Sequence, residues 1–299
     1  MAAKRTTEHR AQNHLRAASS PLGAVSYRTA PTKSVSVGGT RFVYRELGLT
    51  TGVPVIFVNH LAGNLDNWDP RVVDGIAAKH RVITFDNRGV GASEGKTPDT
   101  VEAMARDATA FIRALGFDRA DLLGFSLGGF VSQVIAQQEP ALVRKIILAG
   151  TGPAGGEGIV NVTRLTYLDT FHAYATFKDP KELLFFTRTK QGKSEARAFI
   201  KRLKERTNDR DKAMAIGAFR KQLKAIHAWG LEEPADLSRI QQPVLVANGD
   251  ADRMVPTSNS YDLARRIPNA TLRIYPDAGH GGIFQFHERF VGEALEFLK

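Results

Sequence analysis

The sequence predicts an α/β fold in which helices flank a mostly parallel central sheet. Short, compact apolar runs alternate along the chain with helical patterns, and such runs are typical of strands that are covered on both faces. The chain has 299 residues, of which 42% are hydrophobic and 24% are charged. It is therefore long enough for one large core, or for a core with an inserted subdomain.

Residues 1–33 form the first expected unit, a flexible basic N-terminal arm. They hold six Lys or Arg and a single acid, Glu8, which gives a net charge of +5. The segment is rich in Ala, Ser and Arg, a composition that organelle transit peptides share, and this alternative stays open.

The expected strands begin with a hairpin and continue with buried runs. Residues 35–48 show apolar alternation on both sides of Gly38-Gly39, a pair suited to a tight two-residue turn. The buried strands are expected at 55–59, 82–85, 121–125, 145–149, 244–248 and 272–275.

Helical patterns separate these strands. They cover 101–115, 127–138, 258–266 and 283–298. In the second pattern, apolar residues recur at the i, i+3, i+4, i+7 and i+8 spacing of one helix face. The alternation of strands and helices favours an α/β sandwich built on a parallel sheet.

One block interrupts the alternation. Residues 151–235 contain no convincing strand, whereas 181–187, 194–206 and 211–229 have helical patterns. We expect this block to be a helical cap between two parts of one core, residues 34–150 and 236–299. The cap would lie over the carboxyl edge of the sheet, where open α/β proteins bind their ligands.

The formal net charge of +10 is unevenly distributed. Residues 178–224 carry fifteen Lys or Arg and six acids, a net +9, which together with the arm leaves −4 for the rest. A basic excess confined to an arm and one block, without a recognition motif, argues against a nucleic-acid partner. We expect a solvated helix face in the basic block, with recruitment of an acidic substrate as the alternative.

Several classes of site and location are excluded by composition. The chain has no cysteine, which removes disulfides, thiolate catalysis, iron–sulfur clusters and cysteine-based zinc sites. His287-Glu288 lacks the second histidine of the H-E-x-x-H motif, so no metal site is expected. No apolar run approaches the roughly 20 residues of a membrane span. Because no apolar signal-peptide core is present near the N-terminus, a cytoplasmic location is expected.

Residues 124–129 carry the motif with the clearest chemistry. Their sequence Gly-Phe-Ser-Leu-Gly-Gly follows an apolar run and opens an amphipathic helix. G-x-S-x-G in that setting is a nucleophile elbow, a sharp turn that projects the hydroxyl of Ser126 above the sheet. Ser126 is therefore the expected nucleophile.

A serine hydroxyl needs a base to take its proton and an acid to orient that base. His280 stands in a glycine-rich loop after the last expected strand, and is the expected base. Asp250 and Asp252 both follow the preceding strand. The chain order Ser, Asp, His is the order found in hydrolases with this elbow.

With these residues, the chain resembles the α/β-hydrolase superfamily over roughly residues 35–299. The resemblance rests on residues 59–63 and 86–93, on the elbow, and on the Asp252/His280 pair. Within the superfamily the chain is similar to capped esterases, cofactor-free haloperoxidases (perhydrolases) and proline-iminopeptidase-like enzymes. In that lineage the acid stands three residues after a glycine and shortly before Val-Pro, which selects Asp252 over Asp250. The resemblance implies no cofactor, and it implies that Asp86, Arg88 and Gly89 hold a loop together.

The resemblance also implies an oxyanion hole after the first buried strand. The hole needs two backbone N–H donors, one of them from the residue after the nucleophile. Leu127 supplies the first, and Leu61 is the expected second. The family usually has His-Gly-x in this loop, whereas His60 is followed by Leu61 here. His60 is expected to brace the loop. Within the cap, Trp229, Phe171 and Phe185 are candidates for an apolar acyl pocket.

The predicted function is a serine hydrolase that cleaves a carboxylic ester or related small-molecule acyl substrate through an acyl-enzyme. Peroxide in place of water, or cleavage of a C–C bond, are alternatives on the same triad. Two readings belong to other classes. Residues 150–155 match the G-x-G-x-x-G pattern of a dinucleotide-dependent oxidoreductase, and a hydrolase fold can also serve as a ligand receptor without catalysis. Oligomeric state stays open.

Overall fold

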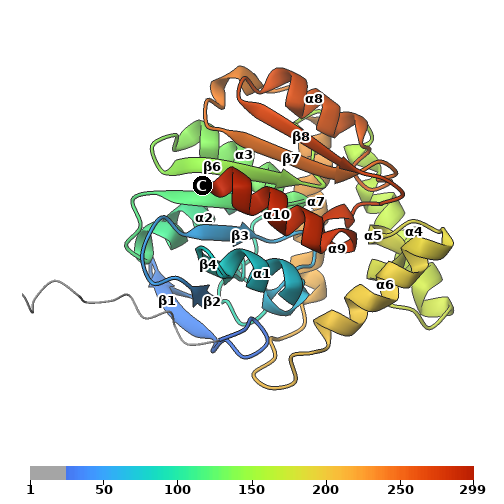
Figure 1. The fold of residues 1–299 in the computed structure, drawn as a ribbon, viewed down its shortest axis with the longest axis horizontal. Helices are drawn as coiled ribbons and strands as arrows, with labels where there is room; N and C mark the ends of the chain where they lie inside the picture. Colours follow the sequence, from blue (N-terminus) through green and yellow to red (C-terminus); the bar gives the residue numbers. More distant parts are fainter. Residues whose placement is uncertain (1–24) are drawn as a thin grey trace, which may run out of the picture.

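The central sheet has eight strands in the order β1-β2-β4-β3-β5-β6-β7-β8 (Figure 1). The computed structural model describes residues 25–299. β1 and β2 form an antiparallel hairpin, β2 is antiparallel to β4, and the six strands from β3 to β8 run parallel. The strands span Lys33–Val37, Thr40–Gly48, Val55–Val58, Arg81–Phe85, Ala120–Phe125, Val143–Ala149, Val244–Gly249 and Ala270–Tyr275.

The parallel strands are buried on both faces, which explains their unbroken apolar sequences. Because side chains alternate along a strand, Ile56 and Leu122 enter one core while Phe57 and Leu123 enter the other. Helices α2, α3 and α8 cover the first face, and α1 and α10 cover the second. These helices span Val101–Ala114, Leu127–Gln138, Ser258–Arg266, Pro70–Ala77 and His287–Leu298. The expected α/β fold with a mostly parallel sheet is confirmed.

The last expected helix, 283–298, is interrupted. A short helix α9 (Gly282–Gln285) ends before Phe286, whose backbone is not helical (φ −108°, ψ 40°), and α10 begins at His287. The guanidinium of Arg202 donates to the carbonyl oxygen of Phe284 (3.0 Å), and the side chain of Gln285 reaches back to the carbonyl of Asp277 (2.9 Å). These tertiary hydrogen bonds replace the helical continuation.

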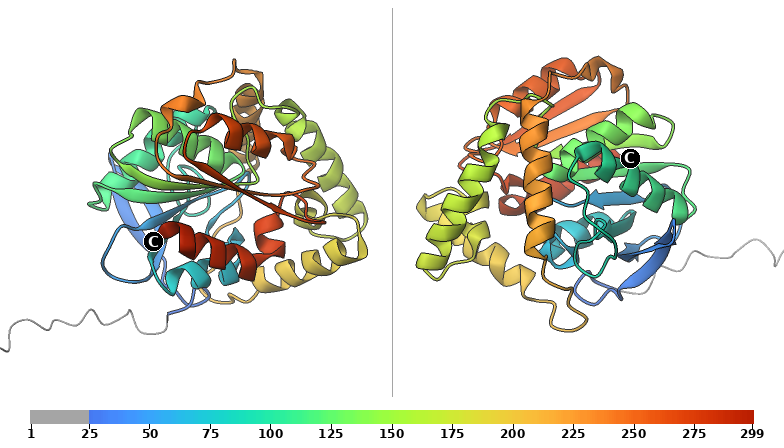
Figure 2. Two further views of the ribbon diagram at one scale, coloured as in Figure 1. Left: turned by 45° about the horizontal axis from the view of Figure 1, so that its top comes forward. Right: turned by 180° about the vertical axis from the view of Figure 1, so that it is seen from behind.

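Helices α4–α7 are inserted between β6 and β7, within the expected block. They span Val162–Ala175, Pro180–Phe185, Lys190–Leu203 and Ile216–Leu231. Figure 1 shows α4, α5 and α6 beside the carboxyl ends of the strands, and Figure 2 shows α7 from behind. α4 was not predicted, because its inward face is polar or small and its outward face is aromatic. α7 begins at Ile216 and not at 211, because Asp211 is bound to the core.

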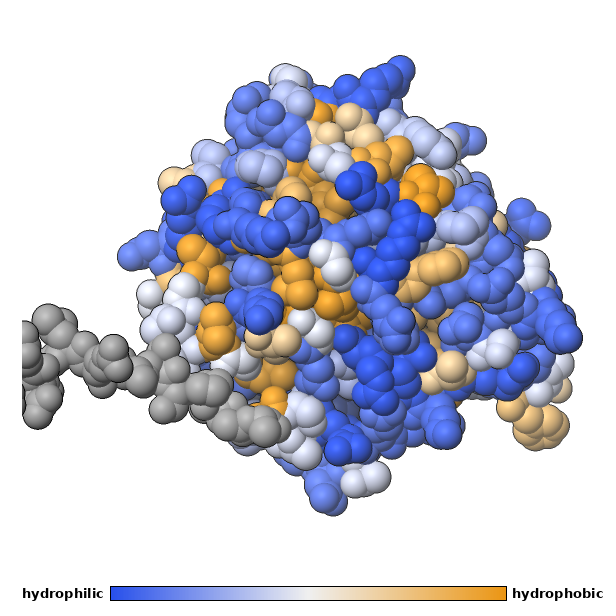
Figure 3. Space-filling model, viewed as in Figure 1, coloured by the Kyte–Doolittle hydropathy of each residue, from blue (hydrophilic) through white to orange (hydrophobic). Residues whose placement is uncertain are grey.

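No helix among residues 25–299 is long and apolar enough to cross a bilayer. The face drawn in Figure 3 is hydrophilic over much of its area, with apolar residues in smaller patches.

Residues 25–33, which belong to the expected flexible N-terminal arm, contact the core. Residues 1–24 lie outside the described part of the chain, but Tyr27 and Ala30 are buried. Arg206, which precedes α7, donates to the backbone carbonyls of Tyr27, Arg28 and Ala30 at 2.9–3.2 Å. An aromatic ring and a guanidinium therefore fasten residues 25–33 to the core.

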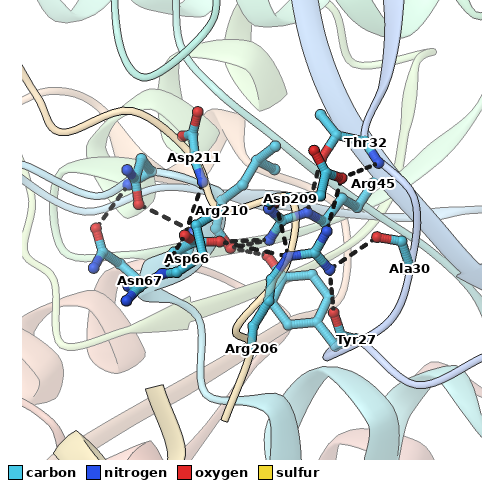
Figure 4. Close-up of polar contacts among 12 residues, drawn as sticks. Tyr27, Ala30, Thr32, Arg45, Asp66, Asn67, Arg206, Asp209, Arg210 and Asp211 are labelled. Carbon is cyan, nitrogen blue, oxygen red and sulfur yellow. Dashed lines mark hydrogen bonds and ion pairs between the residues drawn. The ribbon is translucent and has the colours of Figure 1, made fainter. Parts of the chain in front are cut away.

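The same guanidinium belongs to a buried ionic cluster (Figure 4). Arg45 of β2 and Asp66 are buried and form an ion pair of 2.8 Å. Asp66 also accepts from the Arg210 side chain (3.2 Å) and from the backbone N–H of Asp211 (2.9 Å). Buried charges are tolerated only when they are paired and hydrogen-bonded. The cluster thus holds the segment before α7 against β2 and the 64–66 loop.

Asp211 lies against a second buried carboxyl group, Asp86. Asp86 accepts from the N–H of Leu65 (2.8 Å), and a Cβ at Gly91 would collide with both carboxyl groups. Burial, together with the nearby carboxyl of Asp211, raises the pKa of Asp86 well above its usual value. Two like charges cannot share this space cheaply, so the pair retains a proton that the unfolded chain releases.

This pair predicts a pH dependence of stability. Since the folded-state pKa of Asp86 is raised, the free energy of unfolding falls as the pH rises from about 4 toward that raised pKa. In Asp211→Asn, the amide would replace the like charge with a donor and lower the pKa of Asp86. Between pH 5 and pH 8, the free energy of unfolding should therefore fall in both proteins. We expect the fall to be about 1 kcal/mol smaller in the variant than in the wild type.

Urea unfolding at the two pH values measures this difference. Asp118→Asn, at an exposed position, is the control and should follow the wild type. The same loss of stability in Asp211→Asn and wild type would contradict the proposed shared proton.

Candidate active site

Ser126 lies at the turn between β5 and α3 in a strained backbone conformation, φ 55° and ψ −118°. Non-glycine residues rarely adopt positive φ, and such strain is typical of functional sites. The turn is possible because Gly124 and Gly128, two residues before and after Ser126, have no side chain. A Cβ at Gly124 would strike the carbonyl of Gly128, and one at Gly128 would strike the carbonyl of Val58. The Ser126 carbonyl is held by the hydroxyl of Thr151 at 2.8 Å.

The structure brings Asp252, and not Asp250, to His280. The Nδ1 atom of His280 lies 2.8 Å from Oδ2 of Asp252. The other carboxylate oxygen accepts from the backbone N–H groups of Met254 (2.8 Å) and Val255 (3.1 Å). These bonds fix the carboxylate in place. A proton on Nδ1 directed at Asp252 leaves Nε2 of His280 free to accept one.

The imidazole of His280 is adjacent to the elbow. Its ring centroid lies 5.0 Å from that of Phe125, the residue before Ser126, and a Cβ at Gly150 would stand 3.3 Å from Nδ1. Among residues 25–299, no hydrogen bond joins the Ser126 hydroxyl to His280 or to another group. Such bonds commonly form only when substrate is bound.

The site is almost closed to solvent. Ser126, Asp252 and His280 are 7%, 6% and 3% exposed. The cover includes the end of α5, because the carbonyl oxygen of Phe185 accepts from the N–H of Gly281 at 2.7 Å. In addition, the Phe185 ring lies 5.7 Å from the His280 ring.

The loop after β3 places His60 and Leu61 beside this site. The Nδ1–H of His60 donates to the carbonyl of Leu61 at 2.7 Å, and its ring packs edge-on against Phe125 and Phe185. Burial lowers the pKa of His60 to about 3. His60 is therefore neutral at ordinary pH, which suits a brace for the loop. Within the described chain, the N–H groups of Leu61 and Leu127 have no acceptor.

Gln222 of α7 is a site residue that the sequence analysis missed. Its side-chain oxygen accepts from the N–H of Ala62 at 2.8 Å, and Ala62 has a positive φ of 60°. Gln222 is fully buried, and its amide nitrogen has no partner among residues 25–299. A signal was present: in the helical pattern of 211–229, Gln222 shares the apolar face of Ala218, Ile226 and Trp229.

The three candidate pocket residues have different positions. Phe185 contacts the site as described above. Trp229 is buried, but it stacks on Phe130 of α3 (5.3 Å), within the core that α2, α3 and α8 cover. Phe171 is 76% exposed on the outer face of α4. Phe171 is therefore not part of an enclosed pocket, because α4 turns its aromatic residues outward.

The glycine pattern at 150–155 does not have the geometry of a dinucleotide site. The chain continues as a loop until a short 3-10 turn, η2, at Ile159–Asn161. A pyrophosphate site of this type needs a helix to begin directly at the glycines. Separately, residues 25–299 contain no group of three or more His, Cys, Asp or Glu side chains arranged to hold a metal ion.

Comparisons with known proteins agree with this architecture. Residues 53–286 match the family described as the alpha/beta hydrolase fold. A protein of Caulobacter sp. (strain K31), provisionally named carbamate hydrolase RutD, is 31% identical over 82% of this chain and 90% of its own. A non-heme chloroperoxidase of Streptomyces lividans is 27% identical over 87% of this chain and 97% of its own.

A solved structure is similar along nearly the whole described chain. The alpha/beta hydrolase fold protein from Chitinophaga pinensis is 42% identical, with a TM-score of 0.87 over 92% of this chain and 99% of its own. With the family match spanning most of the sequence, this chain belongs to the alpha/beta hydrolase family.

Proposed function

We propose that this protein is a serine hydrolase that cleaves a carboxylic ester or a related acyl substrate through an acyl-enzyme on Ser126. The proposal rests on one observation above all, the 2.8 Å bond between His280 and Asp252 beside the strained Ser126 turn. Ser126, Asp252 and His280 follow β5, β7 and β8, whose carboxyl ends lie on one edge of the sheet, and they would act as nucleophile, orienting acid and base. This is the arrangement that activates a serine hydroxyl.

In this mechanism, Ser126 Oγ attacks the carbonyl carbon while Nε2 of His280 takes its proton. Asp252 stabilises the imidazolium that forms. The backbone N–H groups of Leu127 and Leu61 bind the oxyanion, and Leu127 is well placed because it is the first residue of α3, where N–H groups have no helical acceptor. His280 then protonates the leaving alcohol. Water, deprotonated by His280, attacks the acyl-enzyme and releases the acid.

Residues 151–235 serve as the cap in this proposal, and Phe185 is its element nearest to the catalytic groups. Because Ser126 and His280 are almost fully buried, a substrate must displace part of this cover to enter. Aromatic rings of Phe125, Phe185 and Phe284 pack together around the site with centroids 5.0–6.2 Å apart. An apolar acyl group would be bound against these rings.

A second candidate is the transfer of the acyl group to peroxide in place of water. It is favoured by the similarity to the chloroperoxidase of Streptomyces lividans. Both reactions use the same Ser126 acyl-enzyme, so product analysis with and without peroxide distinguishes them.

Gln222 acts as a positioning residue in this scheme. Its bond to the Ala62 N–H joins α7 to the loop that supplies the Leu61 donor. An oxyanion donor acts only when its position is held fixed. Loss of this bond should therefore reduce the stabilisation of the transition state more than it reduces the binding of substrate.

Replacing Ser126 with Ala should lower kcat by about 10⁶, because the acyl-enzyme cannot form. The measurement is hydrolysis of a 4-nitrophenyl ester, together with labelling by a fluorophosphonate. Ser132→Ala is the matched control, since Ser132 is a buried serine of α3 whose hydroxyl donates to the Gly128 carbonyl of the same helix (2.7 Å). Near-normal turnover by Ser126→Ala would exclude the proposed nucleophile.

Replacing Asp252 with Asn should lower kcat by about 10⁴, because the amide favours the wrong tautomer of His280. Asp250→Asn is the control: within residues 25–299, the Asp250 carboxylate accepts only a long bond from the Ala278 N–H (3.3 Å), and it has no hydrogen bond with His280. If the two variants lost activity equally, Asp252 would have no special role.

Replacing Gln222 with Leu should lower kcat by about tenfold with little change in KM, since a loosened donor costs less than a deleted one. Gln242→Leu, which removes a buried glutamine bonded to Ala136, controls for general destabilisation. An unchanged kcat would contradict the positioning role. A higher kcat would also contradict it, and would indicate that Gln222 blocks an oxyanion donor at Ala62.

A further inference from the structure

Helix α4 is amphipathic, but most of its large apolar side chains are on the exposed side of the helix. Val162 at its start is buried and Leu165 packs against the core, but its other buried positions, Thr166, Asp169 and Ala173, are polar or small. Phe177, which is also exposed, lies two residues after the helix. The exposed fractions are 49% for Tyr167, 54% for Leu168, 76% for Phe171, 67% for Tyr174 and 100% for Phe177. A row of exposed aromatic residues of this extent is typical of an interaction surface.

The row continues onto α7, which packs beside α4. The rings of Tyr167 and Phe219 meet edge to face at 6.2 Å, and Ile216 at the start of α7 is 71% exposed. Between the two helices lies a surface groove lined by Arg164, Tyr167, Arg220 and His227, among others. We call this surface the α4–α7 face; its residues are Arg164, Tyr167, Leu168, Phe171, Tyr174, Phe177, Lys178, Ile216 and Arg220.

The α4–α7 face is basic. Residues 162–178 and 216–231 together contain five Lys or Arg and one acid. Two of these cations, Lys221 and Lys224, pair with Asp99 (2.9 and 2.8 Å). The acid, Asp169, is buried and bound by Arg188 (3.1 Å) and Arg253 (3.2 Å). Among residues 25–299, Arg164, Lys178 and Arg220 form no ion pair. The exposed aromatic residues are therefore flanked by cations without a counter-charge.

The exposed aromatic residues and unpaired cations of this face distinguish between two possible partners, a second copy of the chain and a lipid bilayer. A symmetric dimer would place the same face on both partners and bring the unpaired cations together, which is unfavourable. A helix with aromatic and aliphatic residues on its outer side and Lys or Arg beside them instead suits the surface of an anionic bilayer. There the rings enter the headgroup region and the cations contact lipid phosphates.

We propose that the α4–α7 face docks on anionic lipid surfaces, with α4 lying in the plane of the interface. Chain connectivity gives this contact a route to the site. α4 leads through residues 176–179 to α5, and the last residue of α5, Phe185, holds the loop of His280. Docking thus places lipid acyl groups next to the element that covers the candidate active site.

Co-sedimentation of the full chain with vesicles tests this surface. The vesicles are phosphatidylcholine alone, or phosphatidylcholine with one quarter phosphatidylglycerol. We expect binding to the anionic vesicles only, with weaker binding as salt rises. Phe171→Ser combined with Phe177→Ser should weaken binding about tenfold. Arg164→Gln and Arg220→Gln should each weaken it about fivefold.

Matched controls lie at the opposite edge of the sheet. Leu49 follows the end of β2 and Arg119 immediately precedes β5, and both side chains are exposed. The control variants are Leu49→Ser and Arg119→Gln. Neither variant should change vesicle binding. Ser126→Ala should bind as the wild type does, so that failure of the proposed catalysis and failure of docking are separate results.

Three outcomes would overturn the proposal. The first is wild-type binding by the Phe171/Phe177 variant, which would assign binding to another part of the chain. The second is equal affinity for both vesicle types. The third is sedimentation-velocity evidence that the face instead mediates self-association, abolished by the same substitutions, without vesicle binding.

Discussion

The strained turn at Ser126 is the constraint on which the candidate site depends. An L-residue with φ 55° and ψ −118° is unfavourable by itself, so the surrounding structure must hold it there. β5 is paired on both sides, by β3 and by β6, and α3 packs closely enough that Gly128 has no room for a side chain. The sheet and the helix together fix the direction of the hydroxyl.

The parallel sheet then determines which other candidate groups lie on the same edge as the Ser126 hydroxyl. The carboxyl ends of β3, β5, β7 and β8 lie along one edge of the sheet (Figure 1), and each is followed by a loop with one or two candidate groups. Those groups are His60 and Leu61, then Ser126, Asp252 and His280. The residues are far apart in the chain, and they converge because parallel strands present all their carboxyl ends on the same side.

The inserted helices are coupled to this edge at two places with different chemistry. One is polar: the Arg45–Asp66 cluster and the Asp86–Asp211 pair hold the segment that leads into α7, and α7 brings Gln222 to the loop of Ala62. The other is both aromatic and polar: Phe185 packs against His280 and accepts a hydrogen bond from the N–H of Gly281, while Thr187 donates to Asp277. The buried ionic network specifies one position of the segment that leads into α7.

The sequence by itself determined the strands, most helices and the candidate nucleophile, because periodicity and the G-x-S-x-G spacing are local properties. Tertiary structure alone decided the features that depend on distant partners. These include the hydrogen bond of Arg206 to the Tyr27 carbonyl, that of Arg202 to the Phe284 carbonyl beside the helix break at Phe286, and the contact of Gln222 with Ala62. α4 escaped prediction for the same reason: its apolar residues face outward, so its sequence lacks the pattern that burial imposes. Phe171 consequently lies in solvent, and only the fold could show it.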